Sequence, residues 1–278
     1  MMGRIILILA LCILIHQRGY SQIERPNQAY GIFNVEVSQA GSGGYLYEYD
    51  ISNANSSLQV LLAFKIFIQD ASFYTRTIES PEERKWYIDG LAKVHITGAA
   101  AGNTLNLPTE NGLSPGESMN ISFSSFGLPA IHPFYTKGFV EPWTEEYLAS
   151  LFEAGYKREE IFLGWKKEWF QGTTISPKVW PDSTSLSTFI DTVEVYRHRS
   201  CTELGWATDP GVCGELEDDL SEVKTALESE DSLSAANALK RFIDLVEAEK
   251  DASLTSEGYA LLYFNADYLR RRLEKEYE

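Results

Sequence analysis

The chain has 278 residues, of which 24 are lysine or arginine and 40 are aspartate or glutamate, so the formal net charge is −16. This acidic balance excludes a protein that binds nucleic acid through the phosphate backbone, because that mode needs clustered basic residues. A hydrophobic content of 44% is enough for ordinary globular cores, and the length predicts one large domain or two modest ones.

Residues 1–21 have the organisation of a secretory signal peptide. A basic start precedes an apolar run at 5–15, and Gly19 and Ser21 place small residues before a cleavage point ahead of Gln22. The run is shorter than the roughly 20 residues that span a bilayer, although an uncleaved anchor is the alternative. Cleavage leaves 22 basic and 40 acidic residues, a net charge of −18. We therefore expect a secreted or periplasmic protein without a membrane span in its mature chain.

Residues 22–200 are the expected β-sandwich domain, and within them residues 30–140 contain alternating apolar and polar residues, as strands do. Phe33, Val35 and Val37 fall on one face of the first run. Segments rich in Gly, Pro, Asn and Ser separate the runs, which is typical of an antiparallel β-sandwich. The expected strands are residues 32–37, 45–49, 60–68, 93–96, 118–123 and 189–196.

A helical segment interrupts this pattern at about 143–171. Thr144 and Glu145 resemble a capped helix start, and a second helix is expected from Glu159 to about Trp169. We predict a helical insertion near the end of the sandwich, with a lid on one edge of the sheet as the alternative.

From Asp209 onward the apolar residues follow a helical period. Three amphipathic helices with short links predict a small antiparallel bundle over residues 201–278. The bundle has 19 acidic and 8 basic residues, so most of the negative charge lies there. The predicted fold is therefore α+β and multidomain: a β-sandwich with a helical insertion, then a three-helix bundle. The apolar sets are Leu216, Leu220, Val223 and Leu227; Leu239, Phe242, Ile243 and Val246; and Leu262, Ala266, Leu269 and Leu273.

Cys201 and Cys213 are the two cysteines outside the leader. In an exported protein a lone pair of cysteines usually forms a disulfide. A zinc site that adds His198 is the alternative, but a fourth ligand with motif spacing is missing. Because Asp209 and Pro210 read as a helix start, the disulfide is expected to attach the first turn of that helix to the element before it.

Three stretches, GWATDPGVCGELEDDLSEV, ANALKRFIDLVEAEK and LTSEGYALLYFNADYL, occur in that order within residues 204–273. Together they resemble the three-helix FIMAH module found near the C-termini of secreted bacterial proteins. The resemblance implies an extracellular accessory role and brings no catalytic residues. Cys213 and the acidic run at 217–219 depart from the first helix of that family.

A second resemblance involves the N-terminal part. The NSS stretch at 55–57 and the LSPGES and FGLP pieces within 113–129 look like β-sandwich domains of secreted bacterial proteins whose role is uncharacterised. This resemblance implies a fold and no function.

Aromatic residues supply the best candidates for a binding surface. Trp165 and Trp169 are i, i+4 neighbours on the expected inserted helix, Phe162 lies one turn earlier, and Trp143 lies upstream. Exposed aromatic rings bind sugars or hydrophobic partners. The alternative is that the helix packs on the sandwich and these rings belong to the core.

No catalytic motif links the ionisable residues. His95 falls in an expected strand, His132 in an expected turn before a proline, and His198 at the end of the last expected strand. The acidic residues show no spacing that predicts the paired carboxylates of a glycosidase. Asp50, Asn53 and Asn55 offer oxygen ligands for calcium, but they lack the glycine and terminal glutamate of an EF-hand loop. An ordinary Asn/Ser turn is the alternative.

These observations favour a non-enzymatic binding or interaction protein over an enzyme. We expect an unknown glycan or protein partner at the cell exterior and no cofactor. One rival hypothesis is an extracellular hydrolase whose acidic residues converge from separate strands. Another is a structural component of a surface assembly, which a large exposed apolar patch would favour.

Overall fold

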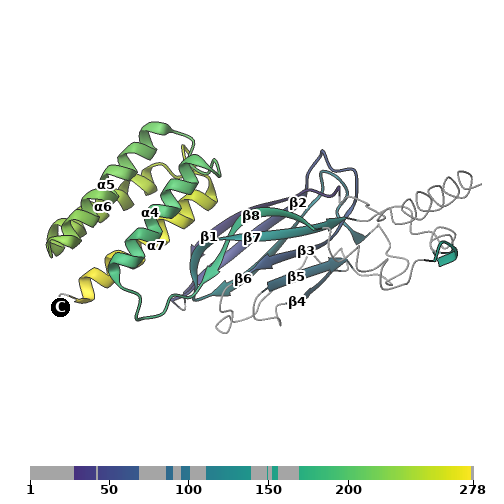
Figure 1. Ribbon diagram of the computed structural model, residues 1–278, viewed down its shortest axis with the longest axis horizontal. Coiled ribbons are helices and arrows are strands. Elements are labelled where there is room, and N and C mark those ends of the chain that lie inside the picture. The colour runs from purple at the N-terminus through teal and green to yellow at the C-terminus, as the bar shows by residue number, and fades with distance from the viewer. Residues whose placement is uncertain are drawn as a thin grey trace, which may run out of the picture.

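The computed structural model has an α+β fold, and its described residues form two antiparallel sheets and four long helices (Figure 1). The expected leader and most of the expected helical insertion, Trp143, Phe162 and Trp165 included, lie outside the residues that the structure describes. The described residues are 28–41, 43–68, 86–89, 95–100, 111–138, 149, 152–155 and 169–276.

The smaller sheet has three strands in the order β1-β2-β6. These are β1 (Gly31–Gln39), β2 (Tyr45–Asn53) and β6 (Ser118–Ser125), and each was expected from its alternation. In β1, Phe33, Val35 and Val37 are buried as predicted.

The larger sheet has five strands in the order β4-β5-β3-β7-β8. The expected runs at 60–68 and 93–96 correspond to β3 and the start of β5, whereas β4, β7 and β8 were not predicted. The strands are β3 (Leu61–Phe67), β4 (Trp86–Asp89), β5 (His95–Ala100), β7 (Leu128–Gly138) and β8 (Phe170–Lys178).

Strand β7 was missed because its two prolines suggested a turn. Pro129 lies opposite Pro177 of β8. In a hydrogen-bonded pair of an antiparallel ladder each residue donates its N–H to the other, which two prolines cannot do. Pro129 and Pro177 are therefore a non-hydrogen-bonded pair, and the backbone nitrogen of Pro129 points away from β8. On that side β3 pairs only with Phe134–Gly138. The prolines therefore leave the β7–β8 pairing intact, and β7 continues through them.

The two sheets pack through side chains of β1 and β2. The Phe33 ring stacks on Phe134 of β7, with centroids 4.0 Å apart, and meets Phe64 of β3 edge-on at 6.0 Å. The buried Tyr49 hydroxyl of β2 donates a hydrogen bond to the Ile175 carbonyl of β8 at 2.9 Å. Aromatic packing and the hydrogen bond of the buried tyrosine hydroxyl thus join the two sheets.

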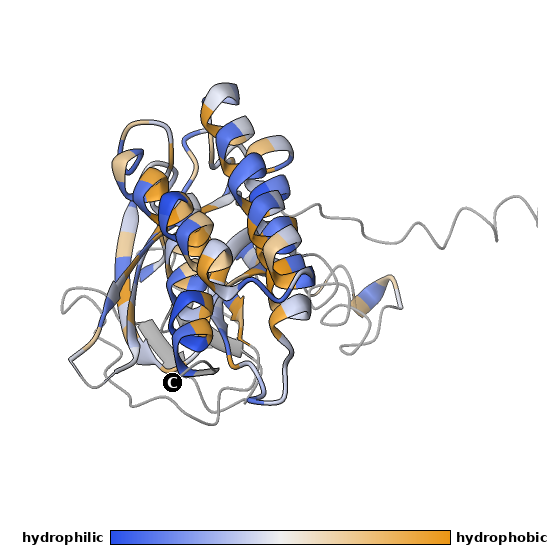
Figure 2. Ribbon diagram, turned by 90° about the vertical axis from the view of Figure 1, so that its left-hand side faces the viewer, coloured by the Kyte–Doolittle hydropathy of each residue, from blue (hydrophilic) through white to orange (hydrophobic). Residues whose placement is uncertain are grey.

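The four helices are α4 (Leu186–Thr202), α5 (Pro210–Glu228), α6 (Ser232–Ala248) and α7 (Ser256–Glu276). Helix α4 packs against α5 and α7, and α6 packs against the same two helices. Each helix carries polar and apolar residues along its length (Figure 2). Nearly all of the apolar residues expected for α5–α7 are fully buried, and Leu227 and Ile243 are partly buried. The three predicted helices are therefore present, together with a fourth.

The expected strand at 189–196 is wrong, because these residues belong to α4. The sequence alternates, but its buried residues include Phe189, Val193 and Tyr196, which recur at helical spacing. Ser185 caps the helix by accepting a hydrogen bond from the Thr188 N–H. The proposed domain boundary at 200/201 consequently falls inside a helix.

The expected insertion also extends too far, because Phe170 and Gln171 begin strand β8. Within that insertion Phe152 and Glu153 are helical. In the part of the chain that the structure describes, no helix is both long and apolar enough to span a membrane.

Candidate functional site

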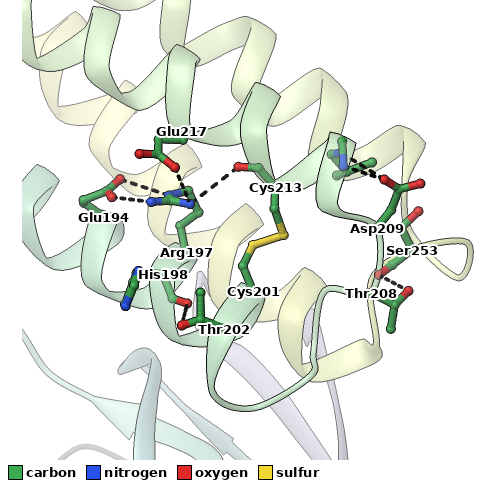
Figure 3. The surroundings of a disulfide bond; sticks show 12 residues. Glu194, Arg197, His198, Cys201, Thr202, Thr208, Asp209, Cys213, Glu217 and Ser253 are labelled. Carbon is green, nitrogen blue, oxygen red and sulfur yellow. Dashed lines mark hydrogen bonds and ion pairs between the residues drawn. A yellow bond between two sulfur atoms is a disulfide. The ribbon is translucent and has the colours of Figure 1, made fainter.

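The disulfide predicted from the sequence joins Cys201 in the last turn of α4 to Cys213 in the first turn of α5 (Figure 3). Their Cα atoms are 6.0 Å apart. Asp209 caps α5 by accepting the Gly211 N–H at 2.7 Å. The disulfide therefore attaches the start of α5 to the preceding element, as expected, but that element is a helix instead of a strand.

A buried arginine lies beside the disulfide. Arg197 is 5% exposed, and its guanidinium contacts the carboxylates of Glu194 at 2.6 Å and Glu217 at 3.2 Å. It also donates a hydrogen bond to the Cys213 carbonyl at 3.5 Å. These contacts give the buried charge partners on α4 and α5.

The zinc alternative for this region does not fit the structure. Both sulfur atoms are used in the disulfide, and His198 is exposed on α4 with its ring directed away from Cys201 and Cys213 in Figure 3. Among the described residues no group of three His, Cys, Asp or Glu side chains is placed to hold a metal ion.

Trp169 is the one member of the predicted aromatic set within the described residues. It is half-buried immediately before β8. The Lys65 Nζ atom lies 4.4 Å from the centroid of its ring, and the Lys137 Nζ atom lies 5.7 Å away. Both distances are in the range of cation–π attraction.

The two lysines come from neighbouring strands of the larger sheet. Lys65 of β3 lies opposite Tyr135 of β7, two residues before Lys137. Because Phe134 packs against the other sheet, Tyr135 and Lys137 lie on the opposite, outer face. Lys137 is 2% exposed, whereas Lys65 and Tyr135 are half-buried. We define Lys65, Tyr135, Lys137 and Trp169 as the Trp169 patch.

Sequence reasoning identified Trp169 but missed the lysines. They are 72 positions apart in the sequence, and only the pairing of β3 with β7 brings them to one ring. Nearby, the ring of Tyr30 meets Phe170 edge-on at 5.3 Å, and Phe170 contacts Phe134. A row of aromatic rings thus runs from the core to the partly exposed Tyr30.

The calcium candidates do not share one face. Asp50 lies on the outer face of β2, whereas Asn53 is buried and donates hydrogen bonds to the carbonyls of Gln59 and Leu113. Asn55 is in the exposed turn after the strand. The side chain of Asn53 stabilises this turn from inside the fold.

Two of the described histidines belong to strands on either side of β3, and the third is on a helix. His132 lies within β7 and not in the expected turn; its ring packs on Phe67 with centroids 4.9 Å apart. Burial, and then the charge of Lys178, lowers the pKa of His132 to about 4. His95 begins β5, and His198 is on α4. Burial and the positive charge of Lys178 both favour a neutral ring at His132.

Comparison of the chain with models of known protein families and with curated proteins finds no match to either.

Proposed function

We propose that this is a non-enzymatic binding protein that acts outside the cytoplasm and uses the Trp169 patch to bind a negatively charged glycan. The observation that carries the proposal is the Lys65 ammonium group lying 4.4 Å from the Trp169 ring on the outer face of a sheet. An aromatic ring can pack on the apolar face of a sugar, and an ammonium group can pair with its carboxylate or sulfate.

The extracellular location rests on two independent features. The N-terminal sequence resembles a secretory signal peptide, and the Cys201–Cys213 disulfide is typical of an oxidising compartment. The chain has 24 basic against 40 acidic residues, so an anionic ligand needs a place where a basic group is available, and Lys65 beside Trp169 offers one.

The finer architecture also belongs to this proposal. Two sheets that face each other through Phe33 and Tyr49 support a β-sandwich. Helices α5–α7 would form the FIMAH-like module, with α4 as an added fourth helix. Both assignments agree with an accessory, non-catalytic role.

The experiment is calorimetric titration of the full chain with alginate, a polyuronate, and with a neutral β-glucan of similar length. We expect saturable binding of alginate only. Trp169→Ala and Lys65→Gln should each weaken it about tenfold, the equivalent of about 1.4 kcal/mol, which is within the range of a cation–π or stacking contact.

Leu58→Ala is the matched control, because Leu58 is 76% exposed and belongs to a turn before β3. It should leave alginate binding unchanged. Equal binding of both glycans, or full alginate binding by correctly folded Trp169→Ala, would contradict the proposal.

A further inference from the structure

Strand β6 is an edge of the three-stranded sheet, and its outward backbone groups can be identified. The Val35 N–H of β1 bonds to Glu257, so the polar backbone groups of Val35 point away from β2. Tyr49, which lies opposite Val35, therefore directs its own groups toward Ile121 of β6. It follows that the alternate residues of β6 direct their N–H and C=O groups away from the sheet. These residues are Ser118, Asn120, Ser122 and Ser124.

In the part of the chain that the structure describes, this edge lacks the usual protection against strand pairing. Edge strands normally carry lysine, proline or a bulge, or are covered by another element. The β6 sequence SMNISFSS has no charged residue, proline or glycine. Edge strand β1, by contrast, is contacted by α7 and by the Glu257 side chain. Within the described residues, β6 pairs with β2 alone.

The outer face next to this edge is acidic. Glu36 of β1 lies directly opposite Glu48 of β2, and Asp50 is two residues further along β2. Like charges that face each other across strands are destabilising. The ion pairs found among the described residues do not involve these three side chains.

The register places short side chains between the acidic residues and the open edge. Ser122 is the β6 partner of Glu48, and Asn120 is the partner of Asp50. A lysine or arginine on a strand added beside β6 is long enough to pass over Ser122 or Asn120 and approach these carboxylates.

We propose that the β6 edge binds an extended segment of another protein as a fourth strand, with lysine or arginine at alternate positions facing the acidic outer face. The backbone of the segment pairs with the outward groups of β6, and its charges complement Glu48 and Asp50. This interaction is separate from the Trp169 patch, which lies on the other sheet, and it does not depend on glycan binding.

A second copy of the chain is the other candidate occupant of this edge. Its own β6 strand, SMNISFSS, has no lysine or arginine. Antiparallel pairing of two β6 strands about a two-fold axis keeps both outer faces on the same side, so the carboxylates of Glu48 and Asp50 in the two copies would face the same surface without a basic partner. A basic segment complements this face, whereas a second copy does not.

The test uses a peptide of about nine residues in which lysine and valine alternate, added to the isotopically labelled full chain. Amide hydrogen exchange is followed by NMR. The N–H groups of Ser118, Asn120, Ser122 and Ser124 should exchange fast without the peptide and become protected with it. The N–H of Ile121, which faces β2, should be protected in both states. Unchanged exchange at the four outward positions would overturn the proposal.

Ser122→Pro tests the pairing directly. Proline removes an outward N–H that β2 does not use, so the strand can keep its own sheet. It should weaken peptide binding about tenfold or more, because one ladder position is lost and the ring obstructs the edge. Ser122→Ala keeps the N–H and should bind as the unmodified protein does. Equal binding by folded Ser122→Pro would overturn the proposal.

The charge requirement has its own variants. A Glu48→Gln/Asp50→Asn protein should bind the lysine peptide several-fold more weakly, and a peptide with glutamate in place of lysine should not bind. Equal binding of the lysine and glutamate peptides would refute a basic partner segment. Self-association of the protein that Ser122→Pro abolishes would show that a second copy of the chain occupies the edge instead. Trp169→Ala should bind the lysine peptide normally, so failure of the glycan proposal and failure of this one can be told apart.

Discussion

The carboxylate of Glu257 accepts a hydrogen bond from the backbone N–H of Val35 at 2.8 Å, across 222 residues of sequence. Glu257 is in the first turn of α7 and Val35 is in the middle of edge strand β1. Both residues are buried. Asn265 adds a second link by donating to the Pro129 carbonyl of β7 at 2.8 Å. Helix α7 is thus bonded to both sheets.

Replacing Glu257 by alanine should lower the free energy of unfolding by about 1–3 kcal/mol, because the buried Val35 N–H loses its acceptor. Urea denaturation measures the loss, and amide exchange should show earlier opening at Val35. Glu257→Gln keeps an acceptor oxygen and should recover part of the stability. Glu215→Ala, an exposed glutamate on α5, should change stability by less than about 0.5 kcal/mol. A loss of that small size for Glu257→Ala would show that the link contributes nothing.

Two helical glycines should respond oppositely to alanine. A Cβ atom at Gly258 would lie 2.5 Å from the Trp206 carbonyl oxygen, a backbone atom that cannot rotate away. Gly258→Ala should therefore destabilise the protein by about 1–3 kcal/mol through overpacking. At Gly214 of α5 an added Cβ meets nothing within 4 Å, so alanine should stabilise by about 0.5–1 kcal/mol. Thermal unfolding of both variants checks the prediction, and the same sign for both would contradict it.

Removal of the disulfide should cost about 3 kcal/mol in the chain-entropy model for a loop of this length. The change is Cys201→Ser/Cys213→Ser, and the measurement is urea denaturation with and without reductant. Reductant should lower the stability of the unmodified protein to that of the double variant and leave the variant unaffected. A double variant as stable as the oxidised protein would show that α4 and α5 hold together without the bond.

Stability should fall in acid partly because of His132. Its pKa of about 4 in the folded protein lies below the ordinary value of 6.5, so the unfolded chain binds the proton more tightly. The stability that depends on a neutral His132 is fully present above about pH 6.5 and is lost as the pH falls toward 4. This loss amounts to about 3 kcal/mol.

His132→Phe keeps a ring against Phe67 and removes this titration. The difference in unfolding free energy between the unmodified protein and this variant should change across pH 6.5 to 4 and be constant above pH 7. A difference that does not depend on pH would show that His132 is not buried in its neutral form.

Local patterns predicted much of the secondary structure. The alternation in β1, β2 and β6 and the helical spacing in α5–α7 place the buried residues correctly, because one-sided burial produces a period of 2 in a strand and 3.6 in a helix. Strand β3 was predicted from its nearly continuous apolar run. The pattern failed at 189–196, where alternation and helical spacing coexist in the same residues. It failed again at β7, where the prolines are tolerated because the side of Pro129 that lacks an N–H group points away from β8.

The sequence by itself determined strands β1, β2, β3 and β6, helices α5–α7, the disulfide and the cap at Asp209, because each depends on residues that are close along the chain. The tertiary structure decided that α4 joins the other helices, that Glu257 reaches β1, and that Lys65 and Lys137 meet at Trp169. It also decided which backbone groups of β6 face outward. Each of these contacts joins residues that are far apart in the sequence. Strand order and register decide which residues come into contact, and no local sequence period encodes either of them.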